Sequence, residues 1–208
     1  DAHKVMEALE QTSYPLPTPT FINNPLYQGG NALSVGAAHS FTGNEPFVLC
    51  MGDHIIFPEM IARLLDTSLQ KCVLGVDPMP RYSFQLDDGT RVLIGPSGEV
   101  TDIGKHLQSW NALDTGVFML TEQVFGTISY LQRLHGPDVE LSQMVRLMGY
   151  RGQPFATCDM SGLFWGDTDT PEDYQAITQL IEEGQWKGSM TALYPDIGRP
   201  PVDMGNVG

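Results

Sequence analysis

The sequence predicts an α/β domain in which helices cover both faces of a mixed, mostly parallel central sheet. Two continuous apolar runs, 46–51 (PFVLCM) and 71–76 (KCVLGV), are typical of strands buried on both faces, as in the parallel sheets of α/β proteins. Amphipathic helical segments alternate with these runs, and short alternating segments between 82 and 103 carry the turn residues of β-hairpins. This order of elements indicates three layers, α/β/α, with one antiparallel excursion.

The residue pattern in the first third of the chain predicts helices before, between and after the first strands. Apolar residues at helical spacing define the first helix, and Pro58 with Glu59 in the opening turn defines the third. Turn residues such as Asn24-Pro25 separate the elements. We expect helices over 2–11, 32–41 and 58–66, and strands over 20–23, 46–51 and 71–76.

The residue pattern in the remainder of the chain predicts hairpin strands first and mainly helices after them. The hairpin segments are YSFQL, RVLI and EVTDI, divided by Asp88-Gly89 and Ser97-Gly98. Thr170 and Pro171 are the expected N-cap and first residue of the last helix. We expect strands over 112–120 and 153–158, and helices over 122–134, 140–149 and 170–181.

The domain organisation follows from a change of composition near residue 184. Residues 1–183 have the periodicity of one folded domain, whereas 184–208 are rich in Gly and Pro and have none, so we expect a tail or linker there.

Composition excludes several classes of function. The 208 residues carry a net charge of −14, which disfavours non-specific binding to nucleic acid or to anionic lipid. No apolar run is long enough to span a membrane, and no direct membrane contact is expected. The three cysteines are widely spaced and are expected to be reduced, so we expect a cytoplasmic protein.

Acidic side chains after one predicted strand, and in a later segment that is a strand end or a loop, are candidate ligands for Mg²⁺. Asp53 follows the apolar run 46–51, and Asp167 and Asp169 lie in FWGDTDTP before the last helix. In open α/β sheets, ligands bind beyond the carboxyl ends of the strands, and Mg²⁺ prefers carboxylate oxygens. Alternatively, each aspartate has only a structural role, in a turn or as a cap of the following helix.

Three further segments are candidates for binding a substrate. Gly29-Gly30-Asn31 leads into a helix N-terminus, which suits an anion, although the Asn is as readily a plain N-cap. Lys105, after Asp102-Ile103-Gly104, is placed to meet a phosphate, although a solvated surface lysine is the default. The segment 111–116 (NALDTG) either lines a pocket or caps the next strand.

Five segments in order resemble the sugar-phosphate-type nucleotidyltransferases, with the closest likeness to the CTP:inositol-1-phosphate cytidylyltransferases and related sugar-1-phosphate nucleotidylyltransferases. They are NNPLYQGGNALSVGAA, PFVLCMGDHI, TDIGKHL, NALDTGVFML and FWGDTDTPEDY. The resemblance implies a Rossmann-like α/β/α fold. It also implies Mg²⁺-dependent transfer of a nucleoside monophosphate from an NTP, with CTP or UTP favoured, to a phosphorylated alcohol or a sugar-1-phosphate, with release of pyrophosphate.

The resemblance also implies roles for individual residues. Asp53 and Asp167 match the metal aspartates, with Asp169 as a rival, and Lys105 matches the lysine that contacts the acceptor phosphate. The implied contacts with the nucleotide are Gly30, Asn31, Ser34, Gly52 and His54. The implied contacts with the acceptor are Asp114, Gly116 and Trp165.

One part of the family pattern is not found in this sequence. The family begins with a strand, a Gly-rich loop with Arg that cradles the triphosphate, and a Pro-Lys pair. We therefore expect the first βαβ portion to lie outside this chain, and we assign activity to the full-length protein, since the chain alone should be inactive. Two alternatives stay open: a non-catalytic nucleotide-binding regulatory module, and a glycosyltransferase that uses Asp167-Thr168-Asp169 and a nucleotide-sugar.

Overall fold

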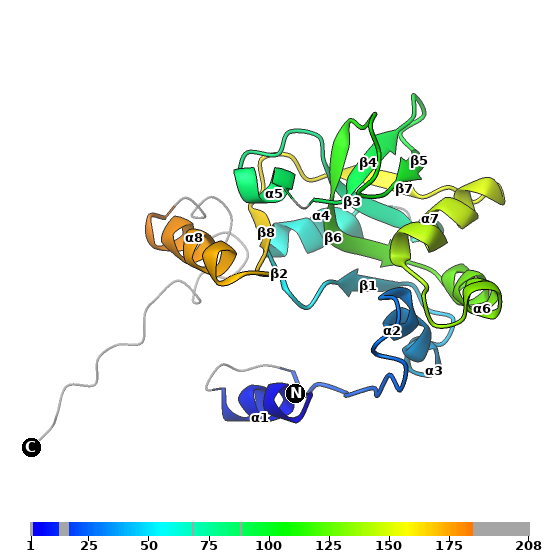
Figure 1. Cartoon of the computed structure of the whole chain (residues 1–208), viewed down its shortest axis with the longest axis horizontal. Helices are drawn as coiled ribbons and strands as arrows, with labels where there is room; N and C mark the ends of the chain where they lie inside the picture. Colours follow the sequence, from blue (N-terminus) through cyan, green and yellow to red (C-terminus); the bar gives the residue numbers. More distant parts are fainter. Residues whose placement is uncertain (1, 13–16, 68, 88, 185–208) are drawn as a thin grey trace, which may run out of the picture.

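A six-stranded mixed sheet forms the centre of the molecule, and a two-stranded sheet lies beside it (Figure 1). The computed structural model describes residues 2–12, 17–67, 69–87 and 89–184. The strands are β1 (Phe47–Cys50), β2 (His54–Ile56), β3 (Val73–Asp77), β4 (Arg91–Ile94), β5 (Val100–Ile103), β6 (Ala112–Leu120), β7 (Ala156–Asp159) and β8 (Trp165–Asp167). The helices are α1 (Ala2–Gln11), α2 (Ala32–Ala37), α3 (His39–Thr42), α4 (Pro58–Leu65), α5 (Ser83–Asp87), α6 (Gln123–His135), α7 (Leu141–Tyr150) and α8 (Pro171–Glu182).

Strand β6 organises the large sheet because it contacts three other strands. Its first residues pair with β4, its last residues pair with β1, and β3 lies along its other edge, in the order β5-β4-β6-β3-β7. The two-stranded sheet joins β2 to β8.

The predicted mixed sheet is confirmed, but the expected excess of parallel pairs is wrong for the part of the chain that the structure describes. There, β3 and β7 pair in parallel, and the other ladders are antiparallel. A continuous apolar run reports burial and not strand direction, which is why the sequence pattern misled here.

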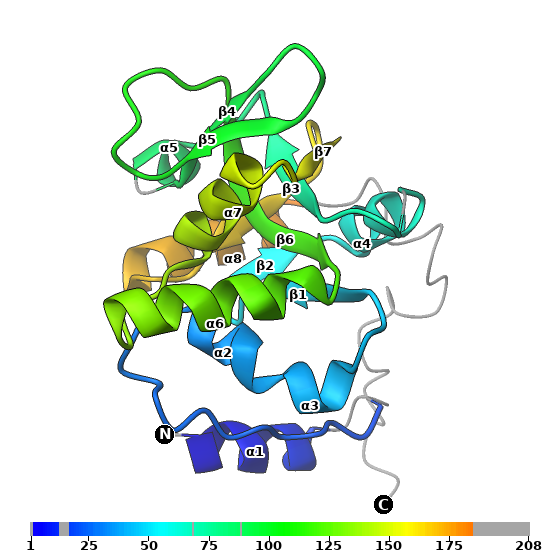
Figure 2. The same ribbon diagram turned by 90° about the vertical axis from the view of Figure 1, so that its right-hand side faces the viewer.

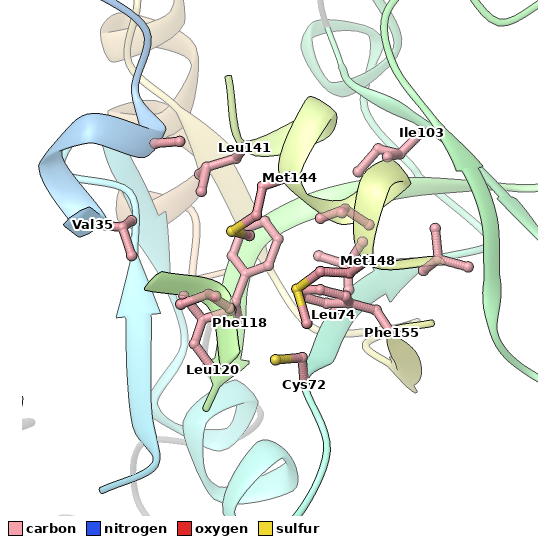
Figure 3. Packing of buried hydrophobic residues seen from close by; sticks show 14 of the residues in the cluster. Val35, Cys72, Leu74, Ile103, Phe118, Leu120, Leu141, Met144, Met148 and Phe155 are labelled. Carbon is pink, nitrogen blue, oxygen red and sulfur yellow. The ribbon is translucent and has the colours of Figure 1, made fainter. Parts of the chain in front are cut away.

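Helices cover both faces of the sheet, as the sequence predicts. One apolar core lies between the sheet and α2, α6 and α7 (Figures 2 and 3), and a second lies between the sheet and α4, β8 and α8. Successive side chains of β3 lie in different cores: Leu74 is in the first core and Val73 is in the second. This alternation follows from the two-residue period of a strand.

Most expected elements form within one to three residues of their predicted limits, and three differ. Residues 20–23 form no strand, and Phe21 and Ile22 are exposed, because no neighbouring strand pairs with them in the described chain. In the segment YSFQL, residues 83–86 lie in helix α5 and form no hairpin strand. The helix expected over 32–41 is divided into α2 and α3 at Ala38.

β1 is half-buried and not fully buried, because among the described residues it pairs on one side only, with β6. None of the described helices has the length and apolar character that crossing a membrane requires. The predicted tail lies outside the described residues, except for Gly184.

Candidate active site

The pairing of β2 with β8 brings the predicted metal aspartates to one place. In this ladder His54 lies opposite Asp167, so Asp53 and Asp167 stand at the same end of two adjacent strands. The Thr168 N–H and Oγ1 both donate to the Asp53 carbonyl, at 2.9 and 3.0 Å. Segments more than a hundred residues apart are therefore fixed to each other at this point.

A cavity of about 500 Å³ opens beside these strands. Among its lining residues are nine that the sequence singles out: Asn31, Asp53, His54, Lys105, Asp114, Gly116, Trp165, Asp167 and Asp169. Three other predicted residues, Gly30, Ser34 and Gly52, are not among the lining residues. The segments predicted to form the site thus converge on one cavity.

Asp114 and Gly116 of β6 line this cavity at the point where the β3–β6 register shifts. The Gly116 N–H donates to Asp114 Oδ1 at 2.8 Å, and Gly116 has a φ of +73°, which favours glycine. A Cβ at Gly116 would overlap the His54 imidazole. His54 Nδ1 lies 3.0 Å from the Thr115 carbonyl, which can only accept, so Nδ1 carries the proton. His54 Nε2 lies 3.8 Å from Asp53 Oδ1.

Two carboxyl groups of the cavity have raised pKa values. Burial raises the pKa of Asp114 from 3.8 to about 6, although the Gly116 N–H and the nearby His54 oppose the shift. Burial also raises the pKa of Asp167, which His54 lowers and the carboxylate of Asp169 raises further. Perturbed carboxyl groups gathered in a cleft are typical of functional sites.

The donor set fits a divalent cation held partly by substrate. Among the described residues, no three His, Cys, Asp or Glu side chains cluster so as to hold a metal by themselves. Mg²⁺ is commonly bound by one or two carboxylates plus phosphate oxygens, and Asp53 with Asp167 matches that pattern. A cation would also offset the repulsion that Asp169 exerts on Asp167.

The glycine loop before α2 packs against the segment that leads into α7. The Gly30 N–H donates to the Pro137 carbonyl at 2.9 Å, and a Cβ at Gly30 would overlap the Val139 backbone. Asn31 Oδ1 accepts the Leu141 N–H at 2.8 Å, at the start of α7. Asn31 is thus a cap for α7 and not for its own helix α2, where it makes no side-chain cap.

Sequence reasoning missed part of the lining. The missed residues are Met51, Gly89, Thr90, Gly104, His106, Phe118, Glu140, Leu141 and Ser142. Two signals in the sequence could have indicated some of them. His106 is next to the predicted Lys105, and Glu140 to Ser142 lie at the start of a predicted helix. Nothing local in the sequence indicates that α7 begins at the cavity.

Comparisons with curated proteins give several relatives and one shared name. The chain is 33% identical over 168 residues to "Bifunctional IPC transferase and DIPP synthase" of Rubrobacter xylanophilus, covering 77% of this chain and 35% of that protein. It is 29% identical over 168 residues to the protein of that name from Thermococcus kodakarensis, covering 81% and 36%. The chain therefore spans about a third of the length of these relatives. No protein-family model matches it.

Solved structures agree on the fold. The inositol-1-phosphate CTP transferase from T. maritima superposes with a TM-score of 0.63 at 23% identity, covering 74% of this chain and 62% of that one. A UDP-glucose pyrophosphorylase complexed with UDP-glucose gives a TM-score of 0.60 at 14% identity, covering 75% and 63%. The predicted resemblance is confirmed: this chain is similar to these proteins and has the fold of the sugar-phosphate-type nucleotidyltransferases.

Proposed function

We propose that the full-length protein transfers a nucleoside monophosphate from an NTP to a phosphorylated alcohol or sugar, with inositol-1-phosphate as the first candidate acceptor. The observation that carries the proposal is the convergence of Asp53, Asp167, Lys105 and Asp114 on one cavity. The relatives named above, which include an inositol-1-phosphate CTP transferase, support this choice of acceptor class.

In the proposed reaction, an oxygen of the acceptor phosphate forms a bond to the α-phosphorus of the NTP. The bond from that phosphorus to the bridging oxygen breaks, and pyrophosphate leaves. A phosphate oxygen is already a nucleophile, so no general base is needed. The protein contributes by positioning the two substrates and by stabilising the developing charge.

The proposed residue roles follow the geometry of the cavity. Asp53 and Asp167 would hold Mg²⁺, which supplies charge neutralisation at the phosphates when it is bound. Lys105 would bind the acceptor phosphate, and Asp114 with Trp165 would contact the rest of the acceptor. His54, fixed by Thr115, would present Nε2 toward the nucleotide side of the site.

The test is pyrophosphate release by the full-length protein with Mg²⁺, over the four NTPs and a panel of phosphorylated alcohols and sugars. Asp53→Asn and Asp167→Asn should each abolish release, and Asp159→Asn, outside the cavity, should not. NTP binding without release for any pair would favour a regulatory module. Consumption of a nucleotide-sugar in place of an NTP would favour a glycosyltransferase.

A further inference from the structure

Trp165 is held by buried hydrogen bonds from two other parts of the fold. Its indole N–H donates to Asp77 Oδ2 at 2.9 Å, and its carbonyl accepts from Gln85 Nε2 at 2.8 Å. Asp77 and Gln85 are each only 2% exposed. A carboxylate and an amide this deeply buried are costly unless they are hydrogen-bonded.

The remaining polar atoms of both side chains are also satisfied. Asp77 Oδ1 accepts the Met79 N–H at 2.8 Å. Gln85 Oε1 accepts the N–H groups of Arg81 and Tyr82, at 3.0 and 3.1 Å. Asp77 ends β3, so this network joins the central sheet, through Trp165, to the separate sheet of β2 and β8.

The β2–β8 ladder needs such a connection because it is very short. Each strand has three residues, and a two-stranded ladder is marginally stable by itself. Side chains alternate along a strand, so Trp165 and Asp167 lie on the same face of β8. A slip of one residue would turn both to the opposite face and remove the Asp167 carboxylate from the cavity.

We propose that Asp77 is a positioning residue for the active site. By holding the Trp165 indole, it fixes the register and the face of β8, and thereby keeps the Asp167 carboxylate in the cavity opposite His54. The role of Asp167 itself rests on the proposed function, whereas the fixing of β8 does not.

Asp159 provides a matched control for Asp77. It ends β7, the parallel neighbour of β3, where it lies opposite Val76. Its Oδ1 accepts the Ser161 N–H at 2.8 Å, in the same type of turn that Asp77 makes with Met79. Asp159 does not line the cavity and has no hydrogen bond to β8 among the described residues.

The experiment compares Asp77→Asn with Asp159→Asn in the full chain. Asparagine keeps the size of the side chain, but its single oxygen cannot replace both carboxylate oxygens as acceptors. Mn²⁺ titration followed by electron paramagnetic resonance should show binding weakened by about 10- to 100-fold in Asp77→Asn, the usual effect of losing a group that orients a metal ligand. Asp159→Asn should bind Mn²⁺ as the wild type does.

A second readout is independent of any metal. Nuclear Overhauser contacts between Ile55 and Gly166 report the β2–β8 register directly. They should be present in the wild type and in Asp159→Asn, and lost in Asp77→Asn. If Asp77→Asn does not fold, Trp165→Phe removes the same hydrogen bond from the other side and should give the same loss.

The two readouts separate the possible failures. Wild-type contacts in Asp77→Asn, with wild-type Mn²⁺ affinity, would overturn the positioning role. Absence of Mn²⁺ binding in the wild type would count against the proposed metal site, and the Ile55–Gly166 contacts would still decide whether Asp77 positions β8.

Discussion

Replacing Asp114 by Asn should make the protein more stable near neutral pH while it damages the site. Burial raises the pKa of the Asp114 carboxyl from 3.8 to about 6. Between these values the folded state binds more protons than the unfolded state, so the free energy of unfolding falls as pH rises through this window. Asparagine keeps an oxygen for the Gly116 N–H and does not titrate.

The magnitude follows from the shift. About 2 pKa units, at about 1.4 kcal/mol per unit, give about 3 kcal/mol as an upper value, because Asp114 lines an open cavity. Urea unfolding followed by circular dichroism gives the free energy of unfolding of each protein at pH 4, 5, 6 and 7. The difference between Asp114→Asn and wild type should move by up to about 3 kcal/mol in favour of the variant from pH 4 to pH 7.

A matched substitution controls for the general loss of negative charge. Asp138→Asn removes an exposed carboxylate outside the cavity, and its difference from wild type should change little over the same range. A difference between Asp114→Asn and wild type that stays constant from pH 4 to pH 7 would show that folding does not raise the pKa of Asp114. Weaker acceptor binding in a more stable variant would mark Asp114 as a residue kept for function at the expense of stability.

Three other predictions concern residues around the same cavity. Gly116→Ala should lower the free energy of unfolding by about 1–3 kcal/mol, because alanine disfavours a positive φ and its Cβ would displace His54. Thermal unfolding measures this loss, and an unchanged unfolding midpoint would contradict it. Lys105→Ala should raise the KM for the acceptor by roughly 10- to 100-fold, the value of a hydrogen bond to a charged group, and Lys71→Ala, on the exposed surface before β3, should not. Mn²⁺ affinity should fall on acidification at a higher pH than a carboxyl of ordinary pKa would cause, because the pKa of Asp167 is raised; a fall that begins only where an ordinary carboxyl is protonated would contradict this.

The fold was predictable where burial pattern and turn chemistry agree. The apolar run of β6 and the Thr170-Pro171 opening of α8 both form as expected. Strand direction was not predictable, because apolar runs in parallel and antiparallel strands look alike once both faces are covered. β2 is only three residues long, and its partner β8 lies more than a hundred residues away, so no local pattern could indicate the ladder.

The site was predictable where chemistry lies at the ends of recognisable strands. Asp53 follows β1, Asp167 ends β8 and Lys105 follows β5, and all three line one cavity. Gly30 carries a glycine signal whose structural cause is close backbone packing against Val139, and the sequence cannot separate that cause from ligand binding. No sequence motif marks Asp77, because its proposed positioning role depends on a hydrogen bond to a residue 88 positions away.

The proposed nucleotide transfer is tested most directly by ³¹P NMR of the full-length protein incubated with Mg²⁺, CTP and inositol-1-phosphate. We expect the paired doublets of a new diphosphate diester, with pyrophosphate appearing in equal amount, and neither signal in Asp53→Asn or Asp167→Asn. The same spectra for the other NTPs and for sugar-1-phosphates would define the substrates. Intact CTP with every acceptor, or hydrolysis to CMP without the diester, would contradict the claim that this site transfers a nucleotide.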